Sequence, residues 1–500
     1  MSFPKSNTNR LGSNPWNVPV AKLRHVGTHC RYPNISGAVR QWCSASMHYA
    51  FEDISWFRLA FANYFGQNET AGAGNLRVTT GLEYPVNRDD LQFIEYQGGV
   101  VGTGPSGADI FSDGFQPDTI IRAGTWYKLW HFHENPTAGI PFHFGGPQPW
   151  TNNAANGLSI ISGTAGGLIN YLMFTATAAE RNALVNTDAS SNQMISPLAI
   201  LTSSKSKSIG ILGDSRTAIQ SSAAPVNFDY VSDASLLQGA GERVFGPLGP
   251  WMNLSASGDS AYNFTTGGLG VRRANYLRFV TDVVNLYGTN DFGSQADLAA
   301  MQALDLKIKT LATVRGKRFW GGTIVPKTTS TDQFLTLAGQ TVTAKESLRK
   351  AVNAWRLSAA DVYDGGVIDY AGQVEDTATG TWKVSAAGSQ VTGNMTVGSN
   401  TFAAGVDVFS PSHNGQVIYV TGAGASSAAL IGRMVYVNSK QVNIVNAITG
   451  AAVNCATAVT AAVTYVDCRK FSADGTHETQ VTGKLYSANL APVAAAAFNR

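Results

Sequence analysis

Residues Ser208–Thr217 read SIGILGDSRT, a short apolar run that ends abruptly in Gly-Asp-Ser. The apolar letters predict a buried strand, and Gly213 allows a sharp turn at its carboxyl end. Ligands of open α/β sheets bind beyond the carboxyl ends of the strands, so Ser215 stands where a reactive group would be placed. The alternative is that Asp214 or Ser215 only caps the helix that follows.

The composition limits the classes of protein to consider. The chain has 500 residues, more than one domain usually holds, so we expect two or three domains. Only 14% of the residues are charged, against about 25% in an average protein, which is typical of a β-rich exported or virion protein. The net charge of +3, without a Lys/Arg cluster, argues against nucleic acid as a partner. No apolar run suits a signal peptide or a bilayer span, so we expect no membrane contact.

Four cysteines form two equally spaced pairs, Cys30 with Cys43 and Cys455 with Cys468. Both two local disulfides and four buried thiols are compatible with this spacing. The pattern leaves the choice open.

Changes of hydrophobic pattern divide the chain into four parts. The first is polar and aperiodic, the second has short alternating runs typical of a jelly-roll-like β-sandwich, and the third alternates apolar strands with helical stretches. The third pattern predicts an α/β domain, a doubly wound parallel sheet in three layers, with a Gly/Ala-rich β module inserted before its closing helix at about 478–498. The predicted parts are an arm (1–24), a β-sandwich (25–206), the α/β domain (207–380 and 468–500) and the inserted β module (381–467).

Two clusters in the predicted sandwich have alternative interpretations. Its aromatic residues are either core or a platform for sugar rings. His131 and His133 share one face of a strand and, with His143, are candidate metal ligands; Glu134 would face the other way, and buried, hydrogen-bonded histidines are the plainer interpretation. The aromatic residues are Trp126, Tyr127, Trp130, Phe132, Phe142 and Trp150.

Three further stretches belong with Gly-Asp-Ser: WMNLSASGDSAYN at 251–263, LYGTND at 286–291 and SADGTH at 472–477. In this order and on these elements, the four motifs resemble the conserved blocks of the SGNH, or GDSL-type, hydrolases. The resemblance covers about 207–380 and 468–500. It departs from the family's other name at Arg216, where that name has leucine, a position to which we assign no role.

The resemblance implies a catalytic triad and an oxyanion hole. Ser215 would be the nucleophile, His477 its base and Asp474 the residue that orients the imidazole. His477 is also the only histidine in the predicted α/β segments. The backbone N–H groups of Ser215 and Gly258 and the side-chain amide of Asn290 would stabilise the oxyanion. No cofactor is implied.

The expected function is therefore that of a serine esterase acting through an acyl-enzyme. The flanking β regions favour an acetylated polysaccharide as substrate, although this step rests on architecture alone. Within the family, a lipase or thioesterase is the other reading. The segment VIYVTGAGASSAALIGRMVYVNS (417–439) is similar to Gly/Ala-rich β modules of bacteriophage tail proteins. A glycan-binding or structural protein of a virion is thus the alternative function. The expected location is extracellular or virion-associated. A homo-oligomer, trimeric if the protein is a spike, is left open.

Overall fold

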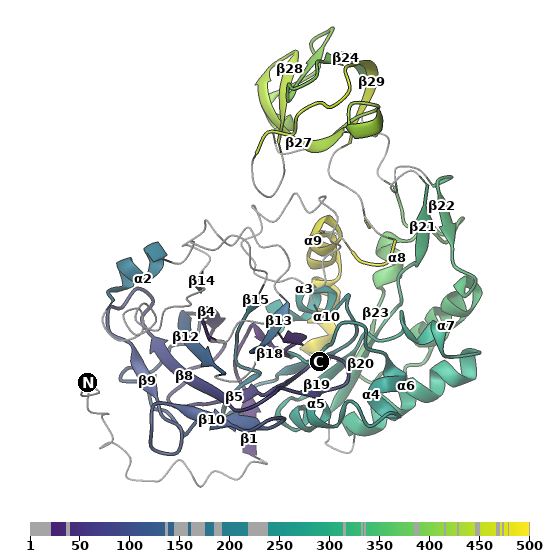
Figure 1. Cartoon of the computed structure of the whole chain (residues 1–500). Helices are drawn as coiled ribbons and strands as arrows, with labels where there is room; N and C mark the ends of the chain where they lie inside the picture. Colours follow the sequence, from purple (N-terminus) through teal and green to yellow (C-terminus); the bar gives the residue numbers. More distant parts are fainter. Residues whose placement is uncertain are drawn as a thin grey trace.

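A computed structural model of the chain shows two β regions and one α/β region (Figure 1). The residues it describes are 22–36, 41–135, 139–144, 159–161, 176–184, 193–218, 239–313, 317–331, 334, 337–384, 390–414, 417–427, 430–445, 451–466, 471–472, 475–478 and 480–499.

A six-stranded sheet with every neighbouring pair parallel lies at the centre of the α/β region, as predicted. Its first strand in this region, β17, is the run before Gly-Asp-Ser, and it lies between β18 and β19. The carboxyl ends of these three strands therefore meet at one edge of the sheet. The order is β2 (Cys30–Arg31), β18 (Trp251–Asn253), β17 (Ile209–Leu212), β19 (Asp282–Asn285), β20 (Arg318–Gly322) and β23 (Gly366–Ile368).

Helices cover both faces of this sheet, because alternate strand residues point to opposite sides. Ile209 and Ile211 pack in one buried cluster with α3, α8, α9 and α10, whereas Leu212 packs in another with α6. Helices α6 and α7 also contact each other. The bounds are α3 (Ala240–Phe245), α4 (Ala261–Thr265), α5 (Val271–Tyr276), α6 (Leu298–Thr313), α7 (Glu346–Ser358), α8 (Tyr370–Val374), α9 (Gln480–Asn489) and α10 (Ala491–Phe498).

The N-terminal β region consists mainly of two antiparallel sheets. Antiparallel sheets confirm a β-rich region here, and a jelly-roll connectivity stays a prediction. The four-stranded sheet has the order β1 (Leu23–His25), β16 (Ala199–Ser203), β5 (Arg58–Ala62) and β11 (Asp109–Phe111). The larger sheet has the order β10 (Gly102–Gly104), β8 (Leu76–Glu83), β12 (Trp126–Glu134), β4 (Gln41–Tyr49) and β14 (Ser159–Ile161), with β9 (Gln92–Ile94) also paired to β8.

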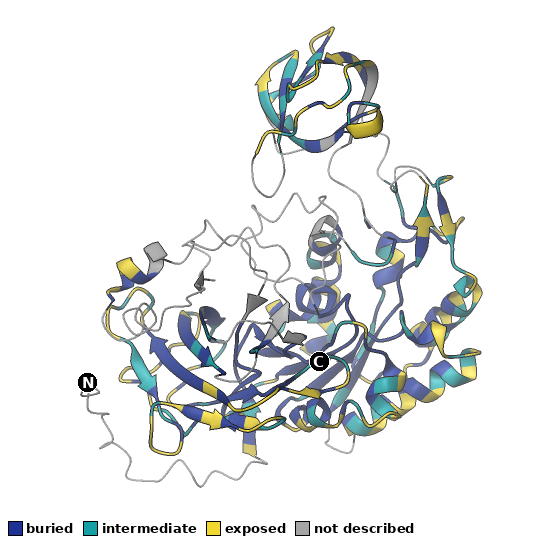
Figure 2. Ribbon diagram, in the orientation of Figure 1, coloured by how far each residue is buried: buried dark blue, intermediate teal, exposed yellow. Residues whose placement is uncertain are grey.

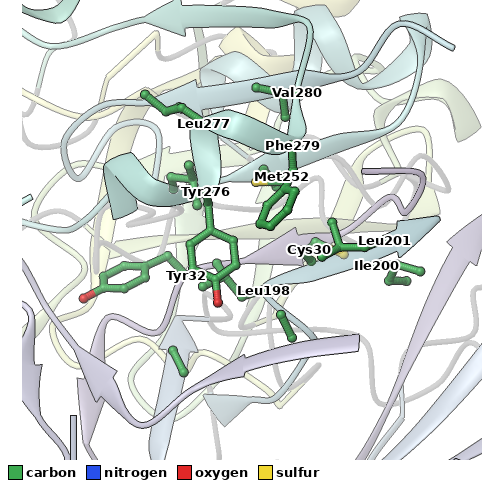
Figure 3. Packing of buried hydrophobic residues seen from close by; sticks show 14 of the residues in the cluster. Cys30, Tyr32, Leu198, Ile200, Leu201, Met252, Tyr276, Leu277, Phe279 and Val280 are labelled. Atoms are coloured by element: carbon green, nitrogen blue, oxygen red, sulfur yellow. The ribbon is translucent and has the colours of Figure 1, made fainter. Parts of the chain in front are cut away.

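The N-terminal region and the α/β region share one hydrophobic core. Strand β2, only two residues long, comes from the N-terminal region and pairs with β18 at the edge of the parallel sheet. Figure 3 shows Cys30, Leu198 and Ile200 beside Met252 and Phe279, and all five belong to the same buried cluster. Figure 2 shows buried residues running through both regions. The two predicted units are therefore packed together as one body.

The inserted module is a closed barrel with a core of its own. Figure 1 shows it standing apart from the sheets of the other two regions. Its core includes Phe402, Ile418 and Met434, all fully buried. The strands follow the order β24 (Gln390–Met395), β25 (Thr401–Ala404), β28 (Gln441–Val445), β27 (Leu430–Asn438), β26 (Val417–Val420) and β29 (Val459–Val466).

Two expectations about local structure are wrong. The predicted arm ends too late, because Leu23 and Arg24 lie in β1 and pair with β16; residues 1–21 lie outside the described part. The predicted closing helix is two helices, since Pro492 opens α10 and cannot supply the N–H that would continue α9.

Neither a membrane-spanning helix nor a disulfide occurs among the described residues. None of the described helices combines the length and apolar character needed to cross a membrane. Cys30, Cys43 and Cys455 are buried thiols rather than half-cystines, and Cys468 lies outside the described residues.

Candidate active site

Ser215 lies in the turn directly after β17, at the carboxyl edge of the parallel sheet. Asp214 Oδ1 accepts the backbone N–H of Arg216 at 3.0 Å, so Asp214 shapes this turn in the manner of a cap. Burial raises the pKa of Asp214. Ser215 keeps 9% of its surface exposed. The capping interpretation of Asp214 is thus compatible with a reactive Ser215.

His477 is hydrogen-bonded to this serine. Its Nε2 lies 2.9 Å from Ser215 Oγ, although the two residues are 262 positions apart in the sequence. This distance is within the range that proton transfer from a nucleophile to its base requires. The structure therefore brings together the nucleophile and the base that the motifs predict.

The loop that carries His477 is fixed by hydrogen bonds within it and to two other segments. Ser472 Oγ accepts the N–H of Gly475 at 2.9 Å and donates to the carbonyl of His477 at 2.8 Å. The Gly475 carbonyl accepts the N–H of Thr328 at 2.9 Å and the indole N–H of Trp382 at 3.1 Å. Gly475 has φ +79°, and a Cβ there would lie 1.9 Å from the Thr328 oxygen. Only glycine fits this position.

The three predicted oxyanion donors follow three adjacent strands. Ser215 follows β17, Gly258 follows β18 and Asn290 follows β19. The loop after β18 is tied to the serine turn by a hydrogen bond from the Ala256 N–H to the Gly213 carbonyl at 3.1 Å. Asn290 Nδ2 donates to the Asp259 carbonyl at 2.9 Å, which joins the loops after β18 and β19. The donors thus lie on one connected set of loops.

Arg273 links this set of loops to the N-terminal region. It is fully buried, and its Nη1 donates to Asp259 Oδ2 at 2.7 Å. The same carboxylate oxygen accepts the Tyr287 hydroxyl at 2.6 Å. On the other side, Arg273 Nε donates to Glu69, a residue of the N-terminal region, at 3.3 Å. The N-terminal region therefore helps to hold the loop that carries Gly258.

The remaining predicted residues are not at this site or cannot be placed. Asp474 lies outside the described residues. His131 and His133 share one face, as predicted, with Phe61 against both rings, and His131 Nε2 is hydrogen-bonded to Ser46 Oγ at 2.7 Å. The side chain of His143 is also outside the described part. Across the described chain, no three His, Cys, Asp or Glu side chains are grouped as metal ligands would be.

For some of the aromatic residues, the structure decides between core and an exposed platform. Tyr127 and Trp130 are fully buried, so they are core residues. Trp126 is 39% exposed. Phe142 and Trp150 have no described side chains.

Arg216 and Glu478 are the residues that the sequence interpretation missed. Each directly follows a member of the Ser215–His477 pair, and their side chains form a buried ion pair. A signal was present, because opposite charges follow the two motif residues in a chain with only 14% charged residues. Only the fold shows that the two charges meet.

Comparisons with family models and with curated proteins give no match. Solved structures of GDSL-type lipolytic hydrolases match about a third of the chain. A GDSL-like lipase from Bacteroides thetaiotaomicron is 13% identical, with a TM-score of 0.25, over 35% of this chain and 75% of that chain. The esterase EstA from a Pseudoalteromonas species is 13% identical, with a TM-score of 0.22, over 33% of this chain and 77% of that chain.

A longer match is a Bacillus subtilis protein, 13% identical with a TM-score of 0.26, over 66% of this chain and 68% of that chain. These scores are too low to define the fold by similarity. The chemistry of the site is therefore inferred from the residues and distances given above.

Proposed function

We propose that the chain is a carboxylic-ester hydrolase with Ser215 as nucleophile and His477 as general base. The observation that carries the proposal is the 2.9 Å hydrogen bond between Ser215 Oγ and His477 Nε2 at the carboxyl edge of a parallel sheet. A serine hydroxyl is a weak nucleophile at neutral pH, and a base at this distance removes its proton as it attacks. The ordered motifs around both residues support the same assignment.

The reaction has two halves. Ser215 Oγ attacks the ester carbonyl, His477 takes the hydroxyl proton, and the negative charge on the carbonyl oxygen is stabilised by Asn290 and the N–H groups of Ser215 and Gly258. The C–O bond to the alcohol then breaks, and His477 gives the proton to the leaving oxygen. Water, deprotonated by His477, next attacks the acyl carbon. The bond between this carbon and Ser215 Oγ then breaks, His477 returns the proton to Oγ, and the carboxylic acid leaves. We propose Asp474 as the carboxylate that orients the imidazole.

We propose an acetylated carbohydrate polymer as the substrate, in a setting outside the cell or on a virion. The support is architectural: a β region with an exposed Trp126 and a separate β-barrel both accompany the α/β region in one chain. A glycan-binding virion protein without catalysis is the second candidate. It is favoured by the barrel, whose core shares no residue with the cores of the sheets.

The test compares the wild-type chain with Ser215→Ala and His477→Ala. Hydrolysis of 4-nitrophenyl acetate should be lost in both variants, and a fluorophosphonate probe should label the wild type but not Ser215→Ala. Retained turnover in a folded Ser215→Ala protein would refute the mechanism. Acetate release from a panel of acetylated polysaccharides tests the substrate. Binding to those polymers without acetate release would favour the second candidate.

A further inference from the structure

A second link joins the two loops that the Ser215–His477 hydrogen bond already joins. Arg216 Nε donates to both carboxylate oxygens of Glu478, at 2.9 and 3.0 Å, and its Nη2 also donates to Glu478 Oε1. Arg216 follows Ser215, and Glu478 follows His477. The two links therefore lie side by side, one between Ser215 and His477 and one between the residues that follow them.

The ion pair is buried and hydrogen-bonded to two other elements. The side chains of Arg216 and Glu478 are 5% and 9% exposed. Arg216 Nη1 donates to Thr289 Oγ1 at 3.4 Å, next to Asn290, and the Tyr486 hydroxyl of α9 donates to Glu478 Oε1 at 3.3 Å. Although burial alone would lower it, the Glu478 carboxylate raises the pKa of Arg216. The Arg216 guanidinium is thus charged, and its hydrogen bonds hold it in place.

The pair is not explained by stability alone. Buried ion pairs contribute little to stability compared with well-packed apolar residues, because desolvation offsets their attraction. What a planar guanidinium against a carboxylate supplies is a fixed geometry, which a lysine does not reproduce. This geometry is of use where two distant segments must keep a set distance, as here.

We propose that Arg216 and Glu478 are positioning residues that hold His477 Nε2 at hydrogen-bonding distance from Ser215 Oγ. The inference rests on the proposed function, since it concerns the same nucleophile and base. The base arrives on a loop from the far end of the chain, after the barrel. The ion pair fixes that loop to the serine turn at the residue next to each reacting group.

The Arg216–Glu478 pair also matters for the charge next to the His477 imidazole. A lone Arg216 cation beside His477 would disfavour the imidazolium that forms during acylation, and a lone Glu478 anion would favour it. The other titratable groups around the pair are Asp214 in the serine turn, Tyr486 on α9 and Tyr370 on α8. Paired, Arg216 and Glu478 present no net charge to the imidazole.

The test uses Arg216→Lys, Arg216→Gln, Glu478→Gln and the double variant Arg216→Gln/Glu478→Gln, with 4-nitrophenyl acetate as the probe. We expect kcat to fall about 100-fold in the single variants, as for a misplacement of roughly 1 Å, with KM little changed. The acid limb of the pH–rate profile should move to higher pH in Arg216→Gln and to lower pH in Glu478→Gln. In the double variant it should return to the wild-type position.

The control is Glu346→Gln, which removes a carboxylate from a partly buried pair on α7: Arg349 Nε donates to Glu346 Oε2 at 2.7 Å, and Arg349 Nη1 also pairs with Glu375 at 2.9 Å. It should lower Tm and leave kcat and the pH profile unchanged. Wild-type kcat in folded Glu478→Gln, or a lower kcat without opposite shifts of the acid limb, would overturn the inference. Ser215→Ala separates the two proposals: if it is inactive while Glu478→Gln is fully active, only the inference fails, and if it is active, the proposed function fails.

Discussion

Glu69 accepts the backbone N–H of Arg273 at 2.8 Å and its Nε–H at 3.3 Å, although the two residues belong to different regions of the chain. A second carboxylate oxygen of Glu69 accepts the N–H of Arg272 at 2.8 Å. Arg273 in turn holds Asp259, which follows Gly258. The N-terminal β region is therefore part of the support for the loop that carries Gly258.

Replacement of Glu69 by glutamine should destabilise the whole protein. We expect a loss of about 1.5–3 kcal/mol, the usual contribution of hydrogen bonds to a charged group, because Arg273 keeps Asp259 as its second partner. Urea unfolding at pH 7 measures the loss. Glu134→Gln is the control, since its pair with Arg77 is 23% and 47% exposed and should contribute about 0–1 kcal/mol. Equal free energies of unfolding for the two variants would contradict this prediction.

Replacement of Asn290 by alanine should reduce turnover with little effect on substrate binding. Loss of one oxyanion donor costs about 10²- to 10³-fold in kcat. Steady-state kinetics with 4-nitrophenyl acetate provide the measurement. A kcat close to that of the wild type would remove Asn290 from the proposed oxyanion hole.

Replacement of Gly475 by alanine should displace the His477 loop. The positive φ strains any other residue by about 1–3 kcal/mol, and the added methyl group would meet the Thr328 carbonyl at 1.9 Å. We expect a lower Tm together with loss of esterase activity. Gly398→Ala, also at positive φ (+81°) but with open space around it in the barrel, should keep full activity. If both variants behave alike, the loop is more tolerant than its contacts indicate.

Acid should destabilise the N-terminal region through its buried histidines. Burial lowers the pKa of His25 to about 4 and the pKa values of His48 and His133 to about 3. An unfolded histidine has a pKa of about 6.5. As the pH falls from about 6.5 toward 3, the unfolded chain therefore binds protons that the folded chain does not. The free energy of unfolding should fall by up to about 1.4 kcal/mol per pH unit for each histidine.

Urea unfolding at a series of pH values from about 7 to about 4 covers most of this pH range and measures the slope. His133→Phe should make it shallower, because one of the proton-binding groups is removed while the ring contact with Phe61 is kept. An unchanged slope in that variant would show that His133 does not contribute to the acid sensitivity.

Much of the α/β region could be predicted because its signals are local. Ile209–Leu212 is a continuous apolar run before a glycine, and Leu304 and Ile308 repeat with the period of a helix. Strand β2 could not be predicted, because Cys30–Arg31 is too short to show a period. It becomes a strand only because the edge of β18 offers it hydrogen bonds.

In the candidate site, too, local motifs could be recognised in the sequence and long-range contacts could not. Ser215, Gly258, Asn290 and His477 lie in short motifs, so sequence was enough to select them. The Arg216–Glu478 pair and the Glu69–Arg273 contact join residues more than two hundred positions apart. Only the folded chain brings such residues together.

The indole of Trp382 meets the Gly475 carbonyl at 3.1 Å, and these residues flank the barrel on its two sides in the sequence. A segment whose two attachment points touch can be lengthened, shortened or exchanged without stretching the framework that it interrupts. The hydrogen bond between Trp382 and Gly475 thus marks a natural graft point. A different domain can be fitted there, in evolution or by design, while the parallel sheet and its loops keep their shape.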